Sequence, residues 1–153
     1  MRYLVLLILI SFSLTGFAQE PTQVDTLSKG EQKMLGIWKL DLPNQKVEGP
    51  SAKKFKSDEE GQIEEKKFWK KNESWICHLR EDKTYLKAWV ENGTLQEEEG
   101  TWSFDESVMV LVLVFKEESN TYEITYREKG QLWKPLRKEK EEFNVLFVKR
   151  LGS

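Results

Sequence analysis

The residues with the most reactive side chains in this sequence are a single cysteine, a single histidine and a run of acids. Cys77 directly precedes His78, and these two residue types can form a nucleophilic pair. Successive side chains of an extended segment point to opposite faces, so on a strand these two cannot form such a pair. Glu97, Glu98 and Glu99 alternate in the same way, which predicts a solvated strand edge and no acid–base pair.

Patterns for other kinds of chemistry are missing from the sequence. It has no nucleophile elbow and no phosphate-binding glycine loop. One Cys and one His exclude a disulfide framework and a zinc site built from several such ligands. We therefore expect no catalytic residues, no metal and no cofactor, and we expect Cys77 to be a small buried side chain.

Side chains suited to an amphipathic ligand are concentrated on three extended segments, where they alternate with other residues and so share a face. The candidate ligand-binding residues are Trp75, Tyr85, Lys87, Trp89, Tyr122 and Tyr126. If these faces point inward, aromatic rings would line a cavity and the polar tips would orient the ligand. The opposite register, with Leu86, Ala88 and Val90 pointing inward, stays open at this point.

Composition limits the broad class of the protein. A length of 153 residues fits one domain, and 39% hydrophobic residues with six Trp are enough for a core. Lys and Arg total 24 against 26 Asp and Glu, so no overall field would attract nucleic acid or an anionic membrane. We therefore expect no nucleic-acid partner.

The first eighteen residues have the pattern of a secretory signal peptide. Arg2 is basic, Leu4 to Leu14 is apolar apart from two serines, and Gly16-Phe17-Ala18 offers small residues for cleavage. The apolar stretch is shorter than the roughly 20 residues that a membrane-spanning helix needs. No Cys follows it for lipid attachment. We expect export to the periplasm or outside the cell, without a stable membrane anchor.

The rest of the chain is predicted to comprise a flexible leader with a short helical turn (19–34), a barrel domain (35–150) and a tail (151–153). Eight segments have the residue pattern of strands and are separated by short turns. These segments are Gly36–Leu42, Ser74–Arg80, Thr84–Glu91, Thr94–Phe104, Val108–Phe115, Thr121–Arg127, Leu132–Leu136 and Phe143–Arg150. Such short turns exclude crossover helices, which predicts an all-β fold: an eight-stranded antiparallel up-and-down barrel in which the first strand pairs with the last.

Three local features refine this prediction. Asn92-Gly93 is the strongest hairpin signal, since both residues tolerate a positive φ. The uninterrupted apolar run Val108–Phe115 predicts burial on both faces. Arg137 to Glu142 is six consecutive charges and predicts a solvated loop.

A charged insert follows the first strand. From Lys53 to Glu73, thirteen of twenty-one residues are charged, which predicts a solvated segment. We expect Gly61 to separate a loop from a short helix over Gln62–Lys71 that docks through Phe68 and Trp69. A short strand over Lys53–Ser57 is the alternative.

Two Gly-x-Trp triplets, Gly36-Ile37-Trp38 and Gly100-Thr101-Trp102, resemble motifs of the lipocalins and of small exported bacterial lipocalin-like domains. In the lipocalin fold the first Trp fills the closed end of the barrel and a basic side chain of the last strand covers it. The resemblance thus implies that Gly36, Trp38 and Arg150 close this barrel. Asn120-Thr121-Tyr122 only approximates the second lipocalin motif.

The resemblance and the aromatic faces together suggest an exported lipocalin-like protein that binds a small hydrophobic or amphipathic molecule inside its barrel. An eight-stranded barrel is just wide enough to be filled by side chains or to hold one small ligand. The main alternative is a non-enzymatic protein-interaction module that uses the barrel as a scaffold and presents Lys53–Glu73 and Arg137–Glu142 to a protein partner. A third interpretation is carbohydrate binding by a row of exposed Trp side chains.

Overall fold

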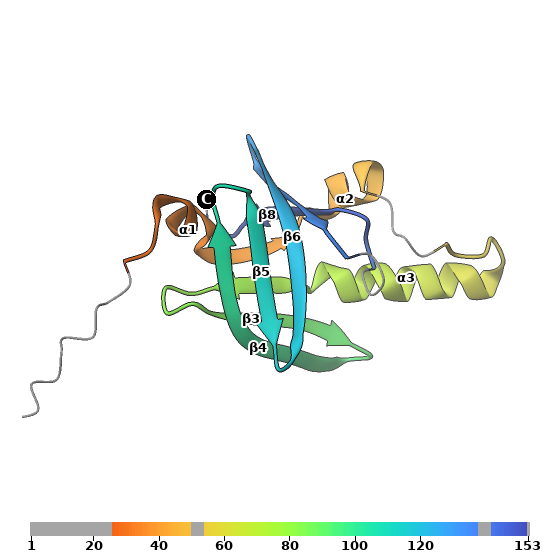
Figure 1. The fold of residues 1–153 in the computed structure, drawn as a ribbon. Helices are drawn as coiled ribbons and strands as arrows, with labels where there is room; N and C mark the ends of the chain where they lie inside the picture. Colours follow the sequence, from red (N-terminus) through yellow and green to blue (C-terminus); the bar gives the residue numbers. More distant parts are fainter. Residues whose placement is uncertain (1–25, 50–53, 138–141, 153) are drawn as a thin grey trace, which may run out of the picture.

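Eight strands form one closed antiparallel barrel in the computed structural model, which describes residues 26–49, 54–137 and 142–152 (Figure 1). The strands are β1 (Gly36–Leu40), β2 (Ile76–Leu79), β3 (Thr84–Glu91), β4 (Thr94–Asp105), β5 (Val110–Phe115), β6 (Glu118–Arg127), β7 (Gly130–Pro135) and β8 (Leu146–Arg150). Each strand pairs with its neighbour in sequence, and β8 pairs with β1. The predicted eight-stranded up-and-down barrel is confirmed. The predicted signal peptide lies outside the described residues.

The turn between β3 and β4 has the predicted conformation. Asn92 and Gly93 have φ angles of 52° and 80°, the positive values that a tight hairpin of this twist requires. Their strands stay paired over the whole length of β3, from Thr84 opposite Thr101 to Glu91 opposite Thr94. This long hairpin extends past the neighbouring strands at one end of the barrel (Figure 1).

Two short helices lie at opposite ends of β1. Helix α1 (Lys29–Met34) precedes it, and a capping box between Ser28 and Glu31 satisfies backbone donors at its start. Helix α2 (Leu42–Glu48) follows it. The predicted extension of the first strand to Leu42 is therefore wrong. Pro43 lies in the first turn of α2, where its fixed φ and missing N–H are compatible with a helix.

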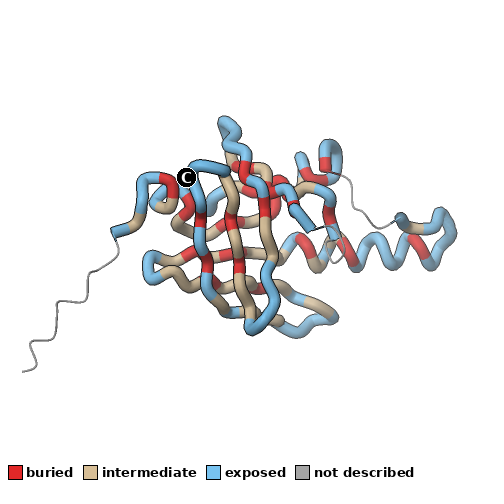
Figure 2. Tube along the Cα trace, viewed as in Figure 1, coloured by how far each residue is buried: buried red, intermediate tan, exposed pale blue. Residues whose placement is uncertain are grey.

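Helix α3 (Glu59–Glu73) is longer than the helix predicted in the charged insert. The expectation that Gly61 precedes the helix is wrong, because Asp58 caps the helix by accepting a hydrogen bond from the Gly61 N–H at 2.8 Å. A Cβ at this glycine would lie 2.1 Å from the Lys56 carbonyl oxygen, so the first turn needs a glycine there. Residues Lys54–Ser57 form no strand. The helix extends away from the barrel, and its outer half is mostly exposed (Figure 2).

Side chains fill the middle of the barrel. The Trp133 ring lies at its centre, with ring centroids of Trp38 and Tyr122 at 6.0 and 5.8 Å. Trp38 and Tyr122 are 4% and 5% exposed, and six further inward-pointing residues are at most 1% exposed: Cys77, Leu79, Tyr85, Leu111, Leu113 and Trp133. Side chains that lined a cavity large enough for a water molecule would have accessible surface facing that cavity. These residues have almost none, so they pack against one another and leave no such cavity between them.

Strand β5 is buried on one face only, and the prediction of burial on both faces is wrong. Leu111 and Leu113 are buried inside the barrel, whereas Val112 and Val114 are partly exposed on its outer face and Val108 is 60% exposed. Antiparallel barrels tolerate such a face because side chains of the flanking strands cover it in part, here Ser103 and its neighbours. An apolar run therefore does not require a second covering layer.

The residues implied in closing the barrel lie together beside α1. Trp38 pairs with Arg150 across β1 and β8, and its indole N–H donates to the Met34 carbonyl at 2.8 Å. Gly36 has a φ of +115°, and a Cβ there would lie 2.7 Å from Arg150 Nε. The glycine thus allows the arginine side chain to lie against the start of β1. We call this the closed end; the other end, where the β3–β4 hairpin and α3 lie, is the open end.

Candidate binding site at the open end of the barrel

Residues Tyr85, Lys87 and Trp89 share the inward face of β3. Tyr85 is fully buried within the core cluster, and Lys87 lies directly opposite Glu98 of β4. The alternative register, with Val90 inward, is wrong, since Val90 is 39% exposed on the outer face.

A polar cluster occupies the inside of the barrel next to this strand. Glu98 Oε1 accepts hydrogen bonds from the Tyr85 hydroxyl at 2.6 Å and from Lys87 Nζ at 2.9 Å. The side chains of Lys87 and Glu98 are 14% and 15% exposed. Burial and the neighbouring Glu98 carboxylate both raise the pKa of Tyr85. The expectation that Glu98 is solvated is therefore wrong, because Lys87 neutralises it inside the barrel.

Two of the predicted ligand residues lie at the open end with part of their surface exposed. Trp75 packs edge-on against Trp133, with ring centroids 6.3 Å apart. The indole N–H of Trp89 is buried and has no hydrogen-bond partner in the described part of the chain.

The two predicted ligand residues on β6, Tyr122 and Tyr126, do not lie with Trp75 and Trp89. Tyr122 is buried against Trp133 in the core. Tyr126 lies at the closed end, where its hydroxyl donates to Met34 Sδ at 3.9 Å and it is 40% exposed. The six predicted residues therefore do not form a single site.

A groove of about 880 Å³ lies between α3 and the β3–β4 hairpin. Its apolar side chains are Phe68 and Val90. Its polar lining consists of Glu64, Lys67, Lys70, Lys71, Glu73, Ser74, Glu91, Asn92, Gly93 and Glu142. This groove, which we call the hairpin groove, is within the size range of sites for small molecules, about 300–1,000 Å³.

Sequence reasoning identified one wall of the hairpin groove and missed the other. Phe68 was expected to dock the helix, and it does so within an aromatic cluster formed with Phe55, Trp69 and Phe143. Val90 and the hairpin tip were not singled out as site residues. An exposed apolar residue beside an Asn-Gly turn is the signal that was available for them.

Lys71 ties together the three segments around the hairpin groove. Its Nζ lies 3.1 Å from Glu91 of β3 and 2.9 Å from Glu142, which precedes β8. Burial alone would lower the pKa of Lys71, but the two carboxylates outweigh it and raise the pKa. The bridge links α3 to β3 and to the segment before β8 at the edge of the groove.

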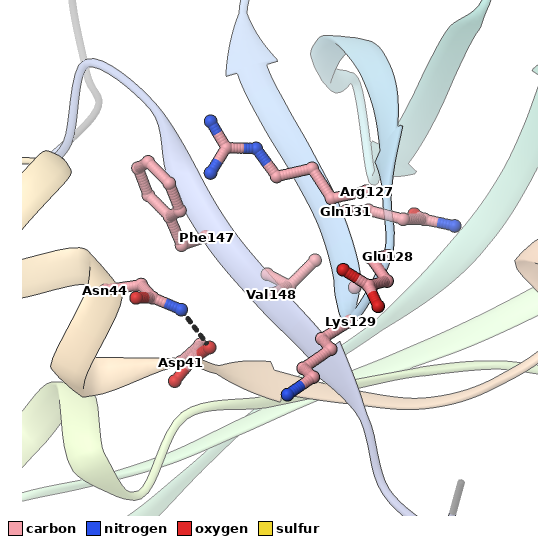
Figure 3. A pocket seen from close by; sticks show the side chains of 9 residues that line it. Asp41, Asn44, Arg127, Glu128, Lys129, Gln131, Phe147 and Val148 are labelled. Atoms are coloured by element: carbon pink, nitrogen blue, oxygen red, sulfur yellow. Dashed lines mark hydrogen bonds between the residues drawn. The ribbon is translucent and has the colours of Figure 1, made fainter.

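A second pocket, of about 470 Å³, lies between α2 and the turn from β6 to β7 (Figure 3). Arg127 forms one wall, where it pairs with Glu48 at 3.1 Å and lies 5.0 Å from the Phe147 ring centroid. On the other wall Asp41 accepts a hydrogen bond from the Asn44 amide at 2.7 Å. Arg127 and Asp41 are thus already paired within the protein. This pocket is the weaker candidate because its volume, about 470 Å³, is little more than half the 880 Å³ of the hairpin groove.

The reactive side chains do not form a catalytic group. Cys77 is fully buried in the barrel, whereas His78 is partly exposed on the outer face. Burial raises the pKa of the Cys77 thiol to about 12, so it stays protonated near neutral pH. Among the described residues, no three His, Cys, Asp or Glu side chains are grouped to hold a metal ion.

The fold and the site together define a closed eight-stranded barrel with a groove at its open end. Comparisons of the chain with protein families, with curated proteins and with solved structures find no match. Within the described ranges, no helix is both long and apolar enough to cross a membrane.

Proposed function

We propose that this protein is an exported, lipocalin-like, non-enzymatic binding protein that takes up a small amphipathic molecule at the open end of its barrel. The observation that carries the proposal is the hairpin groove, in which the half-buried Val90, 39% exposed, and the small accessible part of Phe68, 8% exposed, lie among charged side chains. Such a mixture suits a ligand with one apolar part and one polar part. The signal-peptide pattern supports export.

The groove is a better site than the barrel axis because of how the core is packed. A ligand on the axis would have to displace fully buried side chains such as Trp133 and Tyr85. Removing that packing costs several kcal/mol, about 3–5 for a large aromatic side chain. A ligand in the hairpin groove displaces solvent only.

One observation favours the second candidate function, a protein-interaction module. The outer half of α3 extends beyond the barrel, and Ile63 on it is 50% exposed (Figure 1). A partner that packs on this helix would bind through charged contacts and would lose affinity as salt rises.

The proposal is tested by native mass spectrometry of the chain from residue 19 to residue 153, exported and gently purified from cells. We expect a non-covalent mass that denaturation releases. Val90→Glu places a charge on the apolar surface of the groove and should abolish this added mass. Val108→Glu is the matched control, because Val108 is also an exposed valine but lies at the closed end.

Each result of this experiment decides between the candidates. Loss of the added mass in both variants alike would place the ligand elsewhere. A protein subunit in the native spectrum, in place of a small molecule, would favour the interaction module. A spectrum of the bare chain, also after incubation with decanoate, would count against any small-molecule function.

A further inference from the structure

We propose that the free edge of β4 binds an extended segment of another protein as an additional antiparallel strand, with a basic side chain opposite Glu97 and an apolar one opposite Leu95. This interaction surface is separate from the hairpin groove and does not depend on the proposed function. The observation that carries the inference is the unequal length of the strands on the two sides of β4.

Strand β4 has a neighbouring strand along its whole length on one side only. Its pairing with β3 covers Thr94 to Thr101, whereas its pairing with β5 begins at Thr101 and ends at Asp105. The β3–β4 hairpin therefore extends past the end of the β5–β6 hairpin, with one unpaired edge (Figure 1). This free edge comprises residues 95–99, and a usual strand of about five to six residues can pair with it.

The main-chain groups along the free edge point away from β3. The Trp102 N–H donates to the Lys83 carbonyl at 2.8 Å, so these two residues are a hydrogen-bonded pair of the β3–β4 ladder. Orientation alternates along an antiparallel strand, which directs the N–H and C=O groups of Leu95, Glu97 and Glu99 to the opposite side. None of them has a main-chain hydrogen bond to another described residue. An incoming strand can therefore pair with all of these groups.

A second copy of this chain does not suit the free edge. Pairing two such edges in the register with the longest overlap would place Glu97 opposite Glu97 of the other copy. Like charges at directly opposed positions of a sheet are destabilising. Charged side chains on an edge strand thus protect the protein from self-association. They do not exclude a segment of opposite charge.

The charge balance of the free edge favours a basic segment. Glu98 pairs with Lys87 and Glu99 pairs with Arg80, whereas Glu97 has no ion pair among the described residues. Three carboxylates against two basic partners leave a net charge of −1. Opposite charges on facing positions of neighbouring strands attract each other, so a lysine or arginine is the favoured neighbour of Glu97.

The surroundings of the free edge favour the same partner. Residues 116–118, which follow β5, comprise one lysine and two glutamates, so they add to the negative balance. Leu95 is 59% exposed on the outer face of the hairpin, where an apolar side chain of an added strand would cover part of it. The segment that fits therefore has a basic residue and an apolar residue two positions apart.

The test uses a seven-residue threonine peptide with lysine at its centre and valine two residues later, which an antiparallel pairing places opposite Glu97 and Leu95. The peptide is titrated to millimolar concentration into the chain from residue 19 to residue 153, and NMR follows hydrogen exchange of the β4 amides. Without peptide, Leu95, Glu97 and Glu99 should exchange faster than Gln96 and Glu98. With peptide, these three amides should exchange about tenfold more slowly near saturation.

Three modified peptides separate strand pairing from attraction between charges. N-methylation of the lysine amide removes a donor that faces β4 and should abolish binding. N-methylation of the next threonine alters an amide that faces away from β4 and should change the affinity by less than about threefold. Glutamate in place of the lysine should weaken binding by at least about fivefold.

A charge reversal on the protein tests the position of the basic side chain. Glu97→Lys should reverse the preference, so that the glutamate peptide binds more tightly than the lysine peptide. Glu81→Lys is the matched control, because Glu81 is an exposed acid in the turn between β2 and β3, at the closed end, and the net charge changes equally. This control should keep the preference for the lysine peptide.

Three outcomes would overturn the inference. If no peptide slows exchange at Leu95, Glu97 and Glu99, the free edge does not accept a strand. Equal affinity of the two N-methylated peptides would show that binding does not use main-chain pairing. Slow exchange of these three amides before peptide is added, lost on dilution of the protein, would show that a second copy occupies the edge. The small-molecule site in the hairpin groove is unaffected by each of these results.

Discussion

Lys87 and Glu98 form an ion pair inside the barrel, with Nζ and Oε1 2.9 Å apart on facing positions of β3 and β4. The same carboxylate oxygen accepts a hydrogen bond from the Tyr85 hydroxyl, which is part of the buried core. Removing one member of the pair should therefore destabilise the protein more than replacing both by apolar residues, because the remaining charge would be poorly solvated without its partner.

We predict that removing one member of this pair is worse than removing both. Glu98→Leu should lower the free energy of unfolding by about 2–4 kcal/mol, because Lys87 is left mostly buried without its counter-charge. Adding Lys87→Met to this variant should recover at least half of the loss. Urea unfolding of the two single variants and the double variant measures this. Additive losses would show that the two charges do not depend on each other in the folded state.

The two indole N–H groups on β3 and β4 should respond differently to removal. The Trp102 N–H donates to the Arg80 carbonyl at 2.9 Å, whereas the Trp89 N–H has no partner among the described residues. Replacing each Trp by its benzothiophene analogue exchanges N–H for sulfur at almost constant shape. We expect a loss of about 1–3 kcal/mol at Trp102 and none at Trp89. Thermal unfolding provides the measurement, and an equal loss at both positions would show that the Trp89 N–H is bonded in solution.

The barrel could be predicted from the sequence because its strands are separated by local signals. Asn92-Gly93, for example, determines its own turn through its φ preferences, independently of the rest of the chain. The helix boundaries were less accessible, since Gly61 is a poor helix residue that α3 requires for its contact with Lys56.

The polar contacts of the site were not predictable in the same way. The acidic neighbours of Glu98 in the sequence predict a solvated edge, but β4 brings Glu98 opposite Lys87. Likewise, Lys71 meets Glu142 across a separation of 71 residues. A pattern of charges along the chain does not specify which of them meet, because strand register and helix position decide this.

Stability should fall at alkaline pH because of Cys77. Its thiol has an ordinary pKa of 9.0, and burial raises the pKa to about 12 in the folded protein, with a smaller opposing effect of Lys87. Between these values the unfolded chain has lost the proton and the folded protein has kept it, so the free energy of unfolding decreases as pH rises. Each pKa unit corresponds to about 1.4 kcal/mol. Below pH 9 the thiol causes no pH dependence.

The measurement compares the wild type with Cys77→Ala by urea unfolding between pH 7 and pH 11. The variant should be less stable at pH 7, because it leaves a small cavity, and its stability should fall less steeply above pH 9. Tyr85 is present in both proteins and Cys77 is only the smallest of the causes that raise its pKa, so most of the difference between the two curves comes from the thiol. Parallel curves would mean that the folded thiol ionises as readily as the unfolded one.

Gly36 should be among the least replaceable residues of the closed end. Gly36→Ala places a Cβ on a residue with φ of +115°, which strains the backbone, and 2.7 Å from Arg150 Nε, which adds a smaller cost because the arginine side chain has to shift. We expect a loss of at least about 2 kcal/mol in the free energy of unfolding. Gly93→Ala is the control, because Gly93 also has a positive φ, +80°, but a Cβ there would meet nothing within 4 Å. Its loss should be about 1 kcal/mol.

The two contributions at Gly36 can be separated by shortening the arginine. Arg150→Ala removes the side-chain contact and leaves the backbone conformation of residue 36 unchanged, so Gly36→Ala should cost less in this background. The difference between the two costs measures how closely Arg150 lies against the start of β1 and Trp38. If Gly36→Ala costs the same with and without the arginine side chain, the strain is confined to the backbone, and Arg150 does not close this end of the barrel by packing against Gly36.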